Sequence, residues 1–254
     1  MTGSRTFHLN LAGQEWSIEV TTDSLAQVHR PLLDLMNARA RDRGGRFVVF
    51  LAGPPGSGKT TLCAVWESLS AEDRLLLPMQ TLPLDGFHYT NEYLARTTMP
   101  GAGQEVRLSS RKGCPESYDF AGVRERLLAV RKGDPVSWPF YDRKLHDPVD
   151  NAIKVASSGI LLFEGNYLLL DEPGWRGLVE SADLSIFIES AIETLQDAFQ
   201  RLLKGGKPYD EALKHHLSVD HANYRRLMEH RLVSDITLSM GADRTVTISR
   251  LGRA

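Results

Sequence analysis

The segment 47–60 constrains the fold of this chain more strongly than any other. It joins a run of five apolar residues, 47–51, to a glycine-rich turn that ends in lysine and threonine. A run that is apolar on both faces is typical of a buried strand in a parallel sheet. The turn fits the pattern Gly-x-x-x-x-Gly-Lys-Ser/Thr, in which backbone N–H groups surround phosphate oxygens at the start of a helix. The residues that we expect to hold phosphates are Gly53, Pro54, Pro55, Gly56, Ser57, Gly58, Lys59, Thr60 and Thr61.

Two side chains of this turn have distinct expected roles. Lys59 is expected to reach the β- and γ-phosphates of a nucleotide, and the Thr60 hydroxyl is expected to bind Mg²⁺. The alternative is a glycine-rich turn that matches the pattern by chance. The apolar face formed by Leu62, Val65 and Trp66 supplies the helix that a phosphate-binding loop requires, and it favours the phosphate-binding interpretation.

The rest of the domain alternates apolar runs with amphipathic segments. Asp119 is placed to cap a helix that ends at Gly133, and Ser190 with Glu193 forms a capping-box pattern for a helix that stops at 205–206. Strands that alternate with helices predict an α/β fold, with a mainly parallel sheet flanked by helices. Further strands are expected at 79–84, 160–163, 184–188, 236–240 and 246–248, a further helix runs from Pro208 towards Arg231, and Arg225, Arg226 and Arg231 are expected on a solvated helix face.

The first 45 residues are expected to form an appendage. Apolar residues alternate over 7–11 and over 16–20, with Gly13 between them, which predicts a half-buried β-hairpin. Pro31 suits the first turn of a helix that ends at 44–45. We therefore divide the chain into an N-terminal hairpin and helix, 1–45, and a main domain, 46–254.

Two acidic residues follow predicted strands. Asp85 comes directly after the run 79–84, and Glu164 directly after the run 160–163. In a parallel sheet, ligands bind beyond the carboxyl ends of the strands. A carboxylate at such a position can accept the proton of an attacking hydroxyl or hold Mg²⁺. The alternative for either residue is an acidic side chain that stabilises a turn.

Composition limits the classes of partner. The 254 residues have a formal net charge of −2, so no basic excess points to nucleic acid. The longest apolar runs are too short to span a bilayer, and the first residues lack a signal-peptide pattern. Cys63 and Cys114 form no Cys-x-x-Cys pair and are expected to be reduced thiols. We expect a cytoplasmic protein without nucleic-acid or membrane partners, and a homodimer is one possible assembly.

The order of these motifs resembles that of the P-loop kinases of the pantothenate kinase, uridine kinase and phosphoribulokinase group. The segment 85–91, Asp-Gly-Phe-His-Tyr-Thr-Asn, is similar to the Asp-Gly-Phe…Asn segment of bacterial pantothenate kinases. The segment 111–119 resembles their Lys-Gly-x-Pro-Glu-Ser-Tyr-Asp segment, and 139–142 with His146 resembles the Pro-x-Tyr-Asp…His stretch of uridine kinases. The form at 164–173 looks most like bacterial proteins named fructose-transport-system kinases or nucleoside kinase-like proteins.

This resemblance implies a P-loop NTPase fold, ATP with Mg²⁺, and roles for individual residues. Asp85 matches the catalytic base, and Glu164 matches the second acidic residue at the metal. Arg201 matches the arginine of a helical lid, 200–225, that closes over the phosphates. The residues implied to contact the acceptor are Asp85, His88, Arg111, Tyr141, His146 and Asn223.

The chain departs from uridine kinases where the nucleobase would bind. The position after Tyr141-Asp142 is Arg143 rather than an aromatic residue, and Asp147-Pro148 follows the histidine. The leading hypothesis is therefore a kinase that phosphorylates a hydroxyl of a sugar, a sugar alcohol or a pantothenate-like acceptor. The alternatives are a nucleoside kinase and a catalytically silent nucleotide-binding regulator. A GTPase-like switch is disfavoured because no asparagine precedes a lysine, which leaves the chain without the guanine-reading motif.

Overall fold

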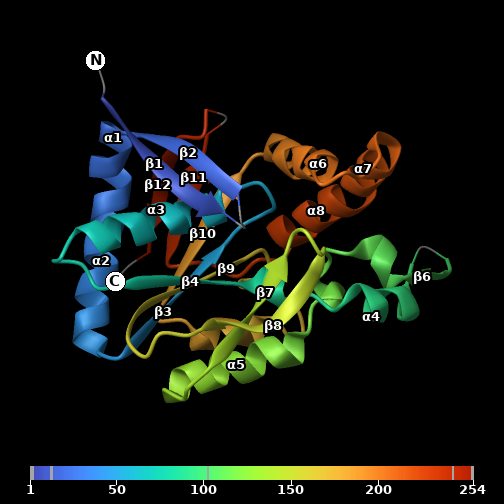
Figure 1. Cartoon of the computed structure of the whole chain (residues 1–254), viewed down its shortest axis with the longest axis horizontal. Helices are drawn as coiled ribbons and strands as arrows, with labels where there is room; N and C mark the ends of the chain where they lie inside the picture. The colour runs from blue at the N-terminus through green and yellow to red at the C-terminus, as the bar shows by residue number, and fades with distance from the viewer. Residues whose placement is uncertain (1–2, 12–13, 102, 242, 253–254) are drawn as a thin grey trace.

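The computed structural model describes residues 3–11, 14–101, 103–241 and 243–252. Its centre is a six-stranded sheet in the order β12-β11-β10-β3-β9-β4, with helices on both faces (Figure 1). Five of these strands are parallel and β12 pairs antiparallel to β11, which confirms the predicted α/β class and the mainly parallel sheet. The strands are β3 (Arg46–Ala52), β4 (Met79–Pro83), β9 (Gly159–Gly165), β10 (Leu184–Ser190), β11 (Ile236–Met240) and β12 (Val246–Leu251).

Two hydrophobic clusters, one on each face, hold the sheet in place. Every residue of β3 and β9 is buried, as the doubly apolar runs predicted. Alternate side chains of β3 enter opposite clusters: Val49 packs with α2 (Arg30–Arg43) and α3 (Lys59–Glu72), whereas Phe50 packs with α5 (Phe120–Lys132).

The ends of two helices test the predicted caps. Asp119 accepts a hydrogen bond from the Gly122 N–H and α5 ends at Gly133 in the left-handed region (φ 84°), both as predicted. The capping box at Ser190 is wrong. Ser190 is the last residue of β10, its hydroxyl accepts a hydrogen bond from the Thr194 hydroxyl, and α6 (Leu195–Lys204) begins only after a 3₁₀ turn.

Between β4 and β9 the chain forms several small elements that the apolar pattern did not predict. Two short antiparallel strand pairs and a short helix lie there. The sequence pattern did not indicate the strands, because they are mostly exposed or half-buried and contain no long apolar run. These elements are α4 (Asn91–Arg96), β5 (Thr98–Pro100), β6 (Glu105–Arg107), β7 (Ser137–Asp142) and β8 (Asp147–Lys154).

The expected lid is a group of helices after β10 (Figure 1). The helix predicted from Pro208 is present, with one π-helical turn in its middle. Its arginines are not all solvated as expected. Arg226 forms ion pairs with Glu116 and Glu172, and Arg231 pairs with Glu189. The elements of this group are α6, α7 (Tyr209–His215), the π-helix His216–Asp220 and α8 (His221–Glu229).

The N-terminal hairpin is formed by β1 (Ser4–Leu11) and β2 (Gln14–Thr21), while Gly13 lies outside the described residues. Phe7 and Leu9 pack against Val65 of α3. Helix α2 packs in the same hydrophobic cluster as β3, so part of the expected appendage shares the core of the sheet. The division of the chain at residue 45 stays a prediction. Two further pieces, α1 (Thr22–Ser24) and the π-helix Leu25–His29, lead from β2 into α2.

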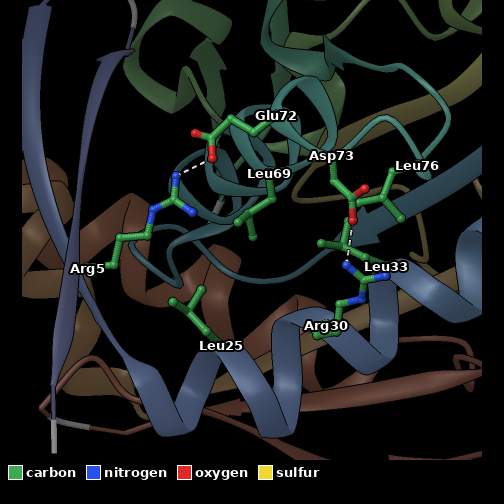
Figure 2. Close-up of a pocket in the computed structure, with 8 residues that line it drawn as sticks. All are labelled: Arg5, Leu25, Arg30, Leu33, Leu69, Glu72, Asp73 and Leu76. Carbon is green, nitrogen blue, oxygen red and sulfur yellow. Dashed lines mark hydrogen bonds and ion pairs between the residues drawn. The ribbon is translucent and has the colours of Figure 1, made fainter.

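A pocket of about 410 Å³ lies between this hairpin, α2 and α3 (Figure 2). Its two arginines are already paired: Arg5 with Glu72 and Arg30 with Asp73. Its α3 residues lie at the end of that helix far from Lys59, so the pocket is separate from the phosphate-binding turn.

None of the helices in the described part of the chain combines the length and the apolar character that crossing a bilayer would require.

Asp183 connects the sheet to two helices, and its loss should destabilise the protein. Its carboxylate accepts hydrogen bonds from Arg43 and Arg131 at 2.6 and 2.7 Å and from the Val48 N–H at 2.8 Å. Burial alone would raise the pKa of Asp183, but these donors outweigh it and lower the pKa. We expect Asp183→Ala to lower the free energy of unfolding by about 2–3 kcal/mol, because both arginines lose a largely buried partner.

The measurement is urea denaturation of Asp183→Ala and of the surface control Asp134→Ala. Since the folded-state pKa of Asp183 is depressed, its contribution is present above the pKa of an unfolded aspartate, about 3.9, and is lost as pH falls through the folded-state value. The difference between wild type and Asp183→Ala should therefore shrink in acid. Equal stability of the two at pH 7 would contradict this account.

Candidate active site

The candidate site lies where the carboxyl ends of three parallel strands meet. The strand register places Leu51 of β3 and Pro83 of β4 on either side of Glu164 in β9. The glycine-rich turn follows β3, and Asp85 comes two residues after the end of β4. The sheet therefore brings the turn and both predicted carboxylates to one edge, as parallel pairing requires.

Tight packing explains the glycines of the turn. Gly56 and Gly58 have φ values of 79° and 82°, in the left-handed region that favours glycine. A Cβ on Gly56 would lie 2.2 Å from the carbonyl oxygen of Thr194, and one on Gly53 would lie 2.8 Å from that of Ile188. Helix α3 begins directly after Gly58, so its N-terminus, which favours anions, opens onto the turn.

Lys59 is buried against the turn that it belongs to. Its ammonium group donates hydrogen bonds to the carbonyl oxygens of Gly53 and Pro54, both at 2.9 Å. Burial lowers the pKa of Lys59 to about 8, although the negative charges of Glu164 and Asp85 act in the opposite direction. The lysine is thus held at the phosphate-binding turn with its proton bound less tightly than usual.

Thr60 and Glu164, the two residues expected to bind Mg²⁺, are in contact with each other. The Thr60 hydroxyl donates a hydrogen bond of 3.0 Å to the Glu164 carboxylate. Burial raises the pKa of Glu164, while the charge of Lys59 lowers it. A hydroxyl and a carboxylate are the hard oxygen ligands that Mg²⁺ prefers. Within the described ranges, no group of three or more histidine, cysteine, aspartate or glutamate side chains could hold a metal by itself, so phosphate and water would have to complete the shell.

The Asp85 side chain is 39% exposed, so its carboxylate is accessible to solvent. The Tyr118 hydroxyl donates to it at 3.4 Å, and a guanidinium nitrogen of Arg143 lies 3.7 Å from its other oxygen. Desolvation alone would raise the pKa of Asp85, but the charges of His88, Arg143, Lys59 and Arg201 outweigh it and lower the pKa. Asp85 is therefore ionised at neutral pH.

Aromatic rings lie beside Asp85. The ring centroids of His88 and Tyr118 are 3.9 Å apart, and those of His88 and Tyr141 are 5.3 Å apart. His88 is fixed because its Nδ1 donates to the Asp85 carbonyl oxygen at 2.8 Å. Two of the residues predicted to contact the acceptor, His88 and Tyr141, thus lie beside the predicted base.

The other three residues predicted to contact the acceptor have contacts with groups other than Asp85. The carbonyl oxygen of His146 accepts hydrogen bonds from Asn91, Lys112 and Tyr141, so its backbone ties the β7–β8 turn to neighbouring loops. Arg111 donates to the Ser218 carbonyl in the π-helix of the lid, and Asn223 is buried in α8. The structure brings Arg111 and Asn223 to the junction between the lid and the loop 111–117.

The lid arginine lies on α6 with its side chain exposed. Arg201 is close enough for its charge to lower the pKa values of both Lys59 and Asp85. The sequence did not indicate a second arginine at this edge. Arg244, in the β11–β12 turn, donates to the Gly56 carbonyl at 3.1 Å and pairs with Asp197 of α6. No local motif marks this residue, because both partners are far from it in sequence.

The arrangement defines a P-loop kinase fold, and comparison with known proteins identifies the family. Residues 48–202, more than half of the chain, match the phosphoribulokinase / uridine kinase family. The chain belongs to this family, as the order of its motifs indicated.

The similar proteins differ in the substrates that their names give. Uncharacterized protein YggC of Escherichia coli K12 is 35% identical over 91% of this chain and 94% of its own length. A Schizosaccharomyces pombe protein named as a candidate uridine kinase is 30% identical over 81% of this chain and 88% of its own length. A pantothenate kinase of Mycolicibacterium gilvum is 28% identical over 79% of this chain and 59% of its own length. A crystal structure from Silicibacter sp. TM1040, described as a candidate fructose transport system kinase, has a TM-score of 0.71 and 35% sequence identity. The match covers 83% of this chain and 98% of that protein.

The depressed pKa of Lys59 predicts a pH-dependent affinity for ATP. Only the ammonium form attracts phosphate, and the bound phosphates should raise the pKa of Lys59 again. Between pH 7 and pH 9 the charged fraction of a lysine with a pKa of about 8 falls about tenfold, so ATP affinity should fall by a similar factor while binding takes up protons.

Isothermal titration calorimetry in buffers of different ionisation enthalpy measures both effects. Lys59→Ala is the control, and it should bind ATP weakly with little change over the same pH range. A constant wild-type affinity from pH 7 to pH 9 would show that Lys59 does not contact the phosphates.

Proposed function

We propose that this protein transfers the γ-phosphoryl group of ATP to a hydroxyl group of a small molecule. The observation that carries the proposal is the partly exposed Asp85 carboxylate, which lies at the same sheet edge as Lys59 and the Thr60–Glu164 pair. A base beside a phosphate-binding loop is what phosphoryl transfer to an alcohol requires.

The residues divide the chemistry among them. The backbone of the turn and Lys59 would bind the phosphates, and Asp85 would orient the acceptor hydroxyl and take its proton. Thr60 and Glu164 would hold Mg²⁺, which when bound neutralises charge on the phosphate oxygens. Arg201, exposed on α6, would add its planar guanidinium when the lid closes over the site and excludes water.

The acceptor side favours a molecule rich in hydroxyl groups or bearing a carboxylate, such as a sugar, a sugar alcohol or a pantothenate-like compound. Arg143 lies beside Asp85, where it can donate hydrogen bonds to oxygen atoms of an acceptor. The Lys112 ammonium group lies 5.1 Å from the centre of the Tyr141 ring and adds a second cation on the same side of Asp85 as Tyr141. The names of the structural neighbour and of the pantothenate kinases agree with such acceptors.

A nucleoside is the second candidate acceptor, and the observation that favours it is the group of aromatic rings beside Asp85. The His88 ring lies within contact distance of both the Tyr118 ring and the Tyr141 ring, and a base could stack on an exposed part of these rings. However, Tyr118 is only 3% exposed, which leaves little of that ring for a ligand. A silent regulator remains the third alternative; the ionised Asp85 beside an intact phosphate-binding turn favours an enzyme instead.

Asp85→Asn tests the reaction itself. The change keeps the size of the side chain but removes the proton acceptor, so ADP release should fall by about a thousandfold while ATP affinity stays within a few-fold. The assay measures ADP release over a panel of sugars, sugar alcohols, pantothenate and nucleosides, and calorimetry measures ATP binding. Asp134→Asn, on the surface, is the matched control. A parallel loss of binding and turnover would make Asp85 a structural residue.

Arg143→Ala tests the class of acceptor. One charge-assisted hydrogen bond is worth about 1.5–3 kcal/mol, so KM for the acceptor should rise about 10- to 100-fold while KM for ATP changes little. The neighbouring exposed cation provides the control Lys144→Ala. If a nucleoside gave the highest kcat/KM in the wild-type panel, by tenfold or more, the proposed acceptor class would be wrong and a nucleoside kinase would replace it.

A further inference from the structure

The phosphate-binding turn is in direct contact with two elements that follow it late in the chain. A Cβ on Gly56 would lie 2.2 Å from the Thr194 carbonyl oxygen and 3.7 Å from Cβ of Asp197, at the start of α6. A Cβ on Gly58 would lie 2.8 Å from the terminal methyl group of Met240, at the end of β11. The turn therefore fits between the lid helix and the β11–β12 turn with no spare room.

Arg244 connects these elements. Its guanidinium donates to the Gly56 carbonyl oxygen at 3.1 Å and forms an ion pair with Asp197. The β11–β12 turn that presents it is itself held by hydrogen bonds, from the Gly241 N–H to the Thr245 carbonyl at 2.8 Å and from the Arg244 N–H to the Gly241 carbonyl at 3.0 Å. Arg244 has a φ of 67°, a backbone conformation that is uncommon for a residue other than glycine.

Both contacts of Arg244 lead to groups of the proposed site. The peptide bond is planar, so fixing the carbonyl of Gly56 also fixes the N–H of Ser57, which closes the phosphate-binding turn by donating to the Pro54 carbonyl at 3.2 Å. On α6, Asp197 precedes Arg201 by four residues, and residues four apart share one face of a helix. An interaction that holds Asp197 therefore also restrains the helix face from which Arg201 extends.

We propose that Arg244 is a positioning residue that couples the phosphate-binding turn to the lid helix. It holds the Gly56–Ser57 peptide and the first turn of α6 in one arrangement, and this arrangement directs Arg201 towards the transferred phosphoryl group. The proposal rests on the proposed function, because Arg201 has this role only if the protein is a kinase.

A merely structural role would have a different signature. The side chains of Arg244 and Asp197 are 45% and 47% exposed, and an ion pair so exposed contributes little to folding stability. Its removal should therefore hardly move the melting temperature. A positioning role should instead lower kcat at nearly constant stability, with a smaller effect on KM for ATP.

The experiment compares Arg244→Ala, Asp197→Ala and the charge exchange Arg244→Asp/Asp197→Arg with wild type. We measure kcat and KM by ADP release, the melting temperature, and hydrogen exchange of residues 195–204 with and without a non-hydrolysable ATP analogue. Each single variant should lower kcat about tenfold with a melting temperature within about 2 °C of wild type, and should lose the protection that the analogue gives to α6. The exchange variant should recover most of both losses, since an arginine at position 197 can pair with the aspartate and reach the Gly56 carbonyl.

The controls separate this proposal from its alternatives. Arg225→Ala removes another exposed lid arginine and should leave kcat and exchange unchanged. Single variants with wild-type kcat and exchange, or an exchange variant no better than the single variants, would overturn the coupling. If one single variant is poorly folded, Arg244→Lys, which keeps the charge, should give a kcat between those of wild type and Arg244→Ala, and a value at or below that of Arg244→Ala would overturn the coupling. If wild type binds the analogue but releases no ADP with any acceptor, the kinase proposal fails, and protection of α6 alone then decides whether Arg244 couples the turn to the lid.

Discussion

The register between β3 and β9 is the constraint on which the rest of the site depends. It sets Leu51 opposite Glu164, so that β3 delivers the phosphate-binding turn to the same edge at which β9 ends in a carboxylate. A shift of one residue would move Glu164 to the other face of the sheet and break its hydrogen bond with Thr60. A slip by one residue would also exchange apolar side chains of different shape between the two clusters and turn the Glu164 carboxylate towards an apolar cluster, and both changes disfavour it.

Burial gives this edge its chemical character. Lys59 is buried and has a lowered pKa, and Glu164 is buried and has a raised pKa, so each is held in surroundings that disfavour its charged form. A bound phosphate would favour the charged lysine, and a bound cation would favour the charged glutamate. A phosphate beside Lys59 and a cation beside Glu164 would each offset the cost of burying these charges.

The parts of the site that sequence could predict are those that follow from local pattern and parallel pairing. The phosphate-binding turn, the strands and the positions of Asp85 and Glu164 at strand ends all follow from apolar runs and the residues directly after them. Ser190 misled because a capping-box pattern carries no information about the strand that continues through it. The pairing of Arg111 with the lid and of Arg244 with Gly56 could not be predicted, since each joins segments more than 100 residues apart through tertiary contacts alone.

The residues proposed to contact the acceptor lie in segments outside the central sheet, whereas the P-loop and Glu164 are held by its buried strands. Arg143 is in the β7–β8 turn, outside the central sheet, and the turn is held in place through the His146 carbonyl, which accepts from Asn91, Lys112 and Tyr141. His146 has a φ of 53°, a conformation that these three donors stabilise. The three donors of this network lie outside the P-loop, whereas β7 itself is tied to the end of β4 by the hydrogen bond from Trp138 to the Pro83 carbonyl at 2.9 Å. Changes confined to the β7–β8 turn would therefore alter the groups beside Asp85 and leave the P-loop contacts in place. Under the proposed function, the exposed segments between β4 and β9 would set the choice of acceptor, and the buried strands would position the residues that act on the phosphates.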